Sequence, residues 1–237
     1  IVNNLCRDFT SGTTVVQTNP IDPNGHGTHV AGIIGASGNN NKGIAGVNWN
    51  IGLVSLRVFD EYGSGYSSHV ANAINFAIQN NISILNLSAG WIEDYREYDF
   101  ALENIIDDYN GLLICASGNE NRNNDGNSPL LPASINLQNI ISVGSHDSNN
   151  NRSWFSNYGE VSVDLFAPGE NILSTYPAHI CNERNHVFDD GTRLCEIPYD
   201  KYVKFLYIMN RDGYTFDELE DHLGDYWHKI DGSNVTP

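Results

Sequence analysis

The sequence has little cysteine, few basic residues and no long apolar run, and each shortage excludes a class of protein. Four cysteines among 237 residues are too few for a scaffold built on disulfides. The longest apolar run, Ala31 to Ala36, is interrupted by glycine and far shorter than the roughly 20 residues that cross a bilayer. Only 12 Lys and Arg stand against 29 Asp and Glu, and the net charge of −17 argues against nucleic-acid binding, which depends on neutralising phosphates.

What is present is typical of a globular domain. Hydrophobic residues make up 40% and aromatic residues 11% of the chain, and its length suits one mid-sized domain with a sizeable core. The stretch from about 178 to 226 is polar, charged and rich in aromatics, and we interpret it as an inserted surface subregion of that same domain, 1–237. The acidity favours solubility through self-repulsion, and export or cation binding would also fit it.

The cysteines divide into two pairs. Cys115 lies in an apolar, strand-like run where a buried thiol is expected, and Cys6 stands apart from it. Cys181 and Cys195 flank a polar stretch, so a local disulfide is predicted if the protein is exported. A metal site that also uses His186 is the alternative, although no CxxC or HxxxH spacing supports it.

Short apolar runs alternate with helical periodicity, which predicts an α/β fold with a parallel sheet flanked by helices in three layers. The predicted strands are 52–58, 82–87, 112–116, 140–143 and 161–165. Ser67 or Ser68 would cap a helix that ends at Asn80-Asn81, and a second helix would run to Tyr109, before Asn110-Gly111. Ligand-binding loops lie at the carboxyl ends of such strands, so the residues after Leu87 and Ala116 are site candidates.

His26 is the sharpest single candidate for chemistry. It follows the turn Asp22-Pro23-Asn24-Gly25 and opens a helix of small apolar residues, in which Gly32 and Gly35 permit close packing. Its spacing to His29 is i, i+3, which is not the HExxH zinc pattern. From the residues alone His26 is a candidate general base, and a histidine that only caps or packs is the alternative.

The stretch His26–Gly32, HGTHVAG, resembles the catalytic-histidine motif of the subtilisin-like serine peptidase family (peptidase S8). Further stretches resemble landmarks of the same family in the same order, over roughly 19–177 and again near Trp227. They are Leu56-Arg57-Val58 with Gly63-Ser64-Gly65, Asn86-Leu87-Ser88-Ala89-Gly90, Ala116-Ser117-Gly118-Asn119-Glu120, Phe155-Ser156-Asn157-Tyr158-Gly159, and Ala167-Pro168-Gly169 with Ser174-Thr175.

The resemblance implies specific roles for these residues. Asn119 would donate its side-chain N–H to the oxyanion of an acyl-transfer reaction. Glu120 would favour a basic residue before the scissile bond. The substrate cleft would be lined by Ser88, Ala89, Gly90, Gly118, Gly63, Ser64 and Gly65.

The motifs for the other two members of a serine-peptidase triad, the serine and the aspartate, match the family less well than the histidine motif. Alignment on the final Thr236-Pro237 puts Ser233 at the nucleophile position, where Asp231-Gly232 replaces the family's Gly-Thr. No Asp-(S/T)-Gly motif precedes His26, so we expect the chain to begin after the catalytic aspartate, and the chain as given to be feeble or inert. The resemblance implies a serine endopeptidase, and a non-catalytic pseudopeptidase that binds peptides or proteins is the alternative.

The resemblance also bears on ions, partners and location. Asn40, in the loop 38–44, resembles a ligand of the family's structural calcium, and the chemistry itself needs no cofactor; an ordinary polar loop is the alternative. The resemblance implies polypeptide substrates, a propeptide in the full-length protein, and secretion. From the composition we expect no nucleic-acid partner and no membrane span.

Overall fold

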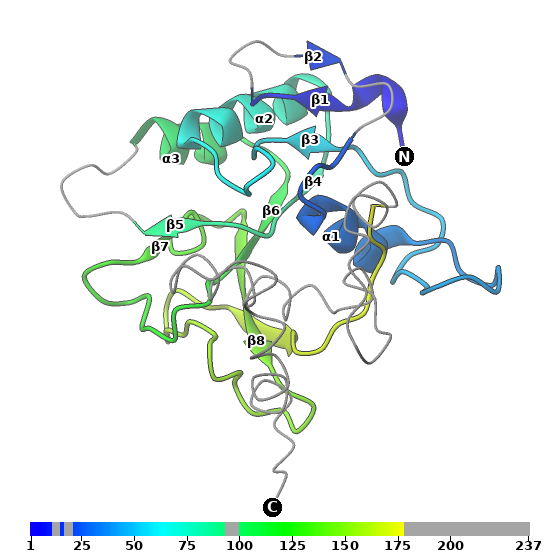
Figure 1. The fold of residues 1–237 in the computed structure, drawn as a ribbon. Coiled ribbons are helices and arrows are strands. Elements are labelled where there is room, and N and C mark those ends of the chain that lie inside the picture. The colour runs from blue at the N-terminus through cyan, green and yellow to red at the C-terminus, as the bar shows by residue number, and fades with distance from the viewer. Residues whose placement is uncertain (11–14, 17–20, 93–99, 178–237) are drawn as a thin grey trace, which may run out of the picture.

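The computed structural model describes residues 1–10, 15–16, 21–92 and 100–177. Figure 1 shows the arrangement of its elements. In chain order they are the 3-10 helix η1 (Asn3–Leu5), β1 (Arg7–Asp8), β2 (Val15–Val16), α1 (His26–Gly35), β3 (Leu56–Arg57), α2 (Ser67–Gln79), β4 (Ile84–Leu87), β5 (Trp91–Ile92), α3 (Phe100–Asp107), β6 (Leu112–Ala116), β7 (Leu130–Leu131), β8 (Ile140–His146) and β9 (Leu165–Pro168).

A four-stranded sheet in the order β4-β6-β8-β9 forms the centre, and every neighbouring pair in it is parallel. The sequence predicted β6 with its observed bounds, and it predicted β4 and β8 with one end displaced. The prediction of a strand at 161–165 was wrong, since β9 begins only at Leu165. The carboxylate of Asp125 accepts the backbone N–H groups of Glu160, Val161 and Ser162, so these groups are not available to a neighbouring strand.

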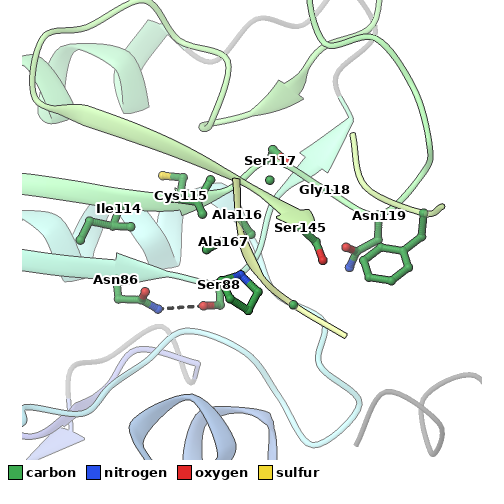
Figure 2. A pocket seen from close by; sticks show the side chains of 15 residues that line it. Asn86, Ser88, Ile114, Cys115, Ala116, Ser117, Gly118, Asn119, Ser145 and Ala167 are labelled. Atoms are coloured by element: carbon green, nitrogen blue, oxygen red, sulfur yellow. Dashed lines mark hydrogen bonds between the residues drawn. The ribbon is translucent and has the colours of Figure 1, made fainter. Parts of the chain in front are cut away.

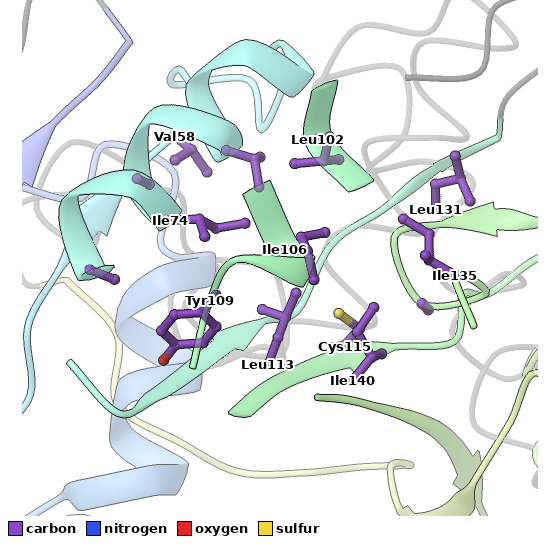
Figure 3. Packing of buried hydrophobic residues seen from close by; sticks show 14 of the residues in the cluster. Val58, Ile74, Leu102, Ile106, Tyr109, Leu113, Cys115, Leu131, Ile135 and Ile140 are labelled. Atoms are coloured by element: carbon purple, nitrogen blue, oxygen red, sulfur yellow. The ribbon is translucent and has the colours of Figure 1, made fainter. Parts of the chain in front are cut away.

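Helices α2 and α3 pack together over one face of this sheet, where the hydrophobic core lies (Figure 3). Alternate residues of β6, Leu113 and Cys115, are buried against them, as period-two alternation requires. On the opposite face Ile84 is 61% exposed and Leu165 46% exposed in the described part of the chain. The predicted parallel sheet with flanking helices is therefore confirmed, and the described residues show the sheet and its α2–α3 layer.

Helix α2 ends at Gln79 with Asn80 as its C-cap, as predicted, whereas its N-cap and the end of α3 differ from the prediction. Ser67 is the first residue of α2, so neither it nor Ser68 is the cap; Tyr66 occupies that position, without a side-chain hydrogen bond. Helix α3 ends at Asp107, two residues before Tyr109. The side-chain amide of Asn139 donates to the carbonyls of Ile106 and Tyr109, which satisfies backbone acceptors that the end of the helix leaves open.

Two small sheets complete the described fold. Strand β1 lies between β2 and β3, and only Leu56–Arg57 of the predicted strand 52–58 pairs with it, because β1 is two residues long. Strands β5 and β7 form an antiparallel pair. Cys6 and Cys115 are buried free thiols; burial was predicted for Cys115 alone, and it raises the pKa of that thiol to about 12. Cys181, His186, Cys195 and the predicted surface subregion lie outside the described residues.

None of the described helices combines the length and the apolarity that a membrane crossing demands.

Candidate active site

His26 is placed by the turn that precedes α1. One oxygen of the Asp22 carboxylate accepts the N–H groups of Asn24 and Gly25, and the other accepts the N–H and hydroxyl of Thr28. The N–H of Thr28 is one of the donors that the start of a helix leaves without an internal partner. Gly25 has φ of +100°, a conformation that favours glycine. Asp22 and Gly25 thus dictate where α1 starts, and His26 is its first residue.

The imidazole of His26 is half-buried, and this environment favours its neutral form. Burial lowers the pKa of His26, the charge of Asp22 opposes that effect, and His29 lowers the pKa further, with a net decrease from 6.5. A neutral imidazole at neutral pH can accept a proton. The electrostatics therefore suit a general base at this position.

Residues 172–176 pack against helix α1 and hold it in place. Ser174 donates its hydroxyl to the carbonyl of His29 at 2.6 Å, and Thr175 donates to Thr28 at 2.8 Å. This close approach needs Gly32, because a Cβ there would lie 2.4 Å from the Ser174 hydroxyl and 2.3 Å from that of Thr175. The prediction that Gly32 permits close packing is confirmed, and the partner is an irregular segment rather than a helix.

The loop 60–65, which carries Gly63, Ser64 and Gly65, lies beside the start of α1. Asp60 Oδ1 accepts the N–H groups of Tyr62 and Ser64, and this closes the loop on itself. The side-chain amide of Asn24 donates to the carbonyl of Glu61 at 3.1 Å. The structure thus brings together the loop and the histidine turn, two stretches that the sequence assigned to one cleft.

A pocket of about 280 Å³ opens where the sheet strands end at their carboxyl edge (Figure 2). The Asn86 side chain donates to the Ser88 hydroxyl at 2.8 Å along one side of it. Both predicted positions, after Leu87 and after Ala116, contribute to its lining. The lining residues are Asn86, Ser88, Ile114, Cys115, Ala116, Ser117, Gly118, Asn119, Val143, Gly144, Ser145, Phe155, Ala167, Pro168 and Gly169.

The turn that carries Asn119 follows β6 directly. Gly118 has φ of +108°, which turns the chain sharply after the strand. Asn119 is exposed at the pocket, and its backbone N–H donates to Glu120 Oε2 at 3.1 Å. A side-chain amide in this place can reach a group bound in the pocket.

Asn157 organises this turn, a role that no sequence pattern indicated beyond the presence of Asn157 in a family landmark. It is fully buried; its Oδ1 accepts the N–H groups of Glu120 and Arg122, and its Nδ2 donates to Glu120 Oε2 and Asn124 Oδ1. A buried amide with all these partners locks two segments together. Its partners lie over 30 residues away, so a search for local patterns does not find it.

Three other predicted site residues, Ser233, His26 and Asn40, are not brought to the pocket by the described structure. Ser233 lies outside the described residues, and His26 is not among the residues that line the pocket. Asn40 is exposed, its Oδ1 accepts the N–H of Lys42, and the loop 38–44 contains no carboxylate. Calcium takes six to eight oxygen ligands, so this loop alone is not a complete site, and calcium stays a prediction.

Comparison with known proteins gives one consistent family. The model of the subtilase family (Peptidase_S8) matches residues 6–197. Subtilisin-like protease 2 of Plasmodium falciparum is 44% identical over 162 residues, which are 67% of this chain and 12% of that protein. Thermitase of Thermoactinomyces vulgaris is 40% identical over 68% of this chain and 55% of its own length.

Relatives also include an intracellular enzyme and a solved structure. The major intracellular serine protease of Bacillus subtilis is 42% identical over 66% of this chain and 48% of its own length. The structure of the prenylagaramide maturation protease PagA matches with a TM-score of 0.56 and 33% identity, over 64% of this chain and 54% of that one. The chain thus spans about half the length of thermitase, of the Bacillus subtilis protease and of PagA.

Proposed function

Because the chain belongs to the subtilase family, we propose that its parent protein is a serine endopeptidase that hydrolyses peptide bonds through an acyl-enzyme. The observation that carries this proposal is the turn Gly118-Asn119 at the carboxyl end of β6, which presents an amide at the pocket. His26, with its lowered pKa at the start of α1, supports it.

In the proposed reaction the Ser233 hydroxyl attacks the scissile carbonyl while His26 takes its proton. The side-chain N–H of Asn119 donates to the oxygen that becomes negative. Collapse of the tetrahedral intermediate expels the amine, to which His26 returns the proton, and water then hydrolyses the ester by the same route. Ser88, Ala89, Gly90 and the loop Gly63-Ser64-Gly65 would hold the substrate backbone.

The third member of the triad has no candidate in the described N-terminal segments. Only Asp8 and Asp22 precede His26 in the sequence. Asp8 accepts hydrogen bonds from Thr10 and forms an ion pair with Arg57 at 3.1 Å. Asp22 is used by the turn before α1. Both carboxylates thus already have structural partners, and neither is assigned as the third member of the triad.

A pseudopeptidase that binds peptides is the second candidate, and the altered Asp231-Gly232-Ser233 motif favours it. A fluorophosphonate probe applied to the full-length protein separates the two. We expect labelling at Ser233, and its loss in Ser233→Ala and His26→Ala. A folded full-length protein that takes up no probe and cleaves no peptide would contradict the peptidase proposal.

Asn119 provides the quantitative test. Removal of such an oxyanion donor from a subtilisin lowers kcat by roughly 10²–10³-fold, and we carry that value over to Asn119→Ala in the full-length enzyme. KM should change little, because the contact strengthens in the transition state. Asn127→Ala, an exposed amide later in the same loop, is the matched control and should leave kcat unchanged.

Secretion and a propeptide remain part of the proposal. Among the relatives is an intracellular protease, so family membership does not decide the location. Calcium is proposed only as a structural ion: a higher Tm of the full-length protein in calcium than in chelator would support it.

A further inference from the structure

Three consecutive hydroxyl side chains after β9 donate to backbone carbonyls around the start of α1. Ser174 and Thr175 donate to carbonyls within the helix, as described above. Tyr176 reaches further back along the chain: its hydroxyl donates to the carbonyl of Asn24 at 3.2 Å, two residues before His26. Of the three, Tyr176 is the one whose hydroxyl bonds the turn rather than the helix.

The contact falls on a peptide unit that is held at both polar ends. The Asn24 carbonyl and the Gly25 N–H belong to the same planar peptide. The N–H donates to Asp22 Oδ1 at 2.8 Å, and the carbonyl accepts the Tyr176 hydroxyl. A rotation of this plane would break both hydrogen bonds, so together they fix its orientation.

Gly25 makes such fixation necessary. Its φ of +100° is one of several conformations that glycine adopts at little cost, so the residue itself does little to hold the turn. The Tyr176 ring lies directly against it: a Cβ built on Gly25 would lie 2.5 Å from both Cε2 and Cζ of the ring. The ring therefore packs on the side of Gly25 where a side chain would stand. His26 is the next residue, so a rotation at Gly25 would displace its imidazole.

We propose that Tyr176 is a positioning residue for His26, which locks the Asn24-Gly25 peptide plane and so holds the imidazole in place for proton transfer. The inference rests on the proposed peptidase function, in which His26 is the general base. Tyr176 contacts the turn and not the reacting atoms, so its removal acts on kcat more than on KM. A misplacement of about 1 Å can lower the rate of such a reaction by roughly 10²-fold.

Two substitutions in the full-length protein separate the hydroxyl from the ring. Tyr176→Phe removes the hydrogen bond and keeps the ring on Gly25, and we expect kcat to fall about threefold to tenfold, the effect of one hydrogen bond. Tyr176→Ala also removes the ring, and we expect a loss of roughly 10²-fold. KM should change little in either variant.

Hydrogen exchange of the backbone provides a second readout. Release of the lock should let the turn open locally, so residues 22–29 should exchange faster in both variants while α2 keeps its wild-type rate. A tyrosine that only stabilised the fold would instead speed exchange in the turn and in α2 alike.

Tyr109→Phe is the matched control. The Tyr109 hydroxyl donates to the carbonyl of Ile82 at 2.9 Å within the core, so the substitution removes the same kind of hydrogen bond far from the turn. It should leave kcat and the exchange of residues 22–29 unchanged.

The inference is overturned by wild-type kcat in folded Tyr176→Phe, or by a loss of kcat that Tyr109→Phe reproduces. Exchange that rises equally in α2 and in the turn also overturns it. A folded wild type that neither cleaves peptides nor reacts with a fluorophosphonate overturns the peptidase proposal itself, and with it the role of Tyr176 in the reaction.

Discussion

At the scale of single residues, His26 is defined by its surroundings more than by its own chemistry. The turn organised by Asp22 makes it the first residue of α1, and burial lowers its pKa. Asp22 has its own pKa lowered: burial acts to raise it, but hydrogen bonds from Gly25, Thr28 and Asn24 prevail. The carboxylate therefore stays ionised near neutral pH, and its charge limits the shift of the imidazole without reversing it.

The pH dependence of His26 follows from this direction. We expect its imidazole to titrate with a midpoint below 6.5, the ordinary value. At a pH between the lowered pKa of the folded chain and the ordinary pKa of the unfolded chain, the unfolded chain binds the proton and the folded chain does not. The contribution of His26 to the free energy of unfolding therefore falls as the pH drops below about 6.5. Above that pH the contribution is constant.

NMR titration of the imidazole C–H signals measures this midpoint, with His26→Gln to assign the signal. In the full-length enzyme a triad aspartate beside the imidazole would raise this pKa, so the acidic limb of kcat/KM, where protonation removes the base, should lie above the midpoint of this chain. A midpoint at or above 6.5 would show that Asp22 dominates over burial.

At the scale of elements, the local sequence pattern predicted correctly those strands whose bounds depend on neighbouring residues. The run Leu112–Ala116 is apolar and bounded by Gly111 and Gly118, and it forms β6 as predicted. The misplacement of β9 and the early end of α3 have distant causes, namely the Asp125 carboxylate and the Asn139 amide. Such side chains take up backbone groups from positions about 30 or more residues away, and no local window contains both partners.

The packing of α1 against residues 172–176 makes an element-scale prediction. Gly32→Ala should destabilise the protein by about 1–3 kcal/mol, because the new Cβ meets the hydroxyls of Ser174 and Thr175 and lies 3.0 Å from the Thr175 backbone nitrogen. Gly27→Ala is the matched control in the same helix. A Cβ there meets only Asp22 at 3.5 Å or more, so the substitution should be neutral or stabilising by up to about 1 kcal/mol.

Chemical denaturation of both variants, with the midpoint and slope compared, measures the difference. Equal stabilities would mean that the 172–176 segment yields freely and does not hold α1.

At the scale of the whole molecule, the candidate site depends on contacts between distant parts of the chain. The motifs indicated which segments belong to the site, but not which residues of those segments touch. The motifs indicated that His26, Gly63-Ser64-Gly65 and Asn119 belong to one site. The hydrogen bond from Asn24 to Glu61 joins the first two, and the parallel register of β4 and β6 brings Ser88 and Asn119 to one pocket. The motifs could not indicate that Tyr176 packs on Gly25 and bonds the Asn24 carbonyl, because this contact joins segments from opposite ends of the described chain.

Asn157 offers the test of such long-range organisation. Its amide joins the turn Gly118–Arg122 to the segment that follows β8, and the Asn157 N–H donates to the Gly118 carbonyl at 3.0 Å. Asn157→Ala removes the side-chain bonds and leaves the part-buried N–H of Glu120 and the buried Oδ1 of Asn124 short of partners, at a cost of about 2–4 kcal/mol to the free energy of unfolding.

Because Asn157 touches the turn and not the reacting atoms, Asn157→Ala should also displace Asn119 and lower kcat of the full-length enzyme, with KM less affected. Addition of Asn119→Ala to Asn157→Ala should then cost less in kcat than Asn119→Ala alone, since both act through one amide. Denaturation and steady-state kinetics on the four forms of this cycle measure both effects. Additive losses in kcat would show that Asn157 supports the fold without positioning Asn119.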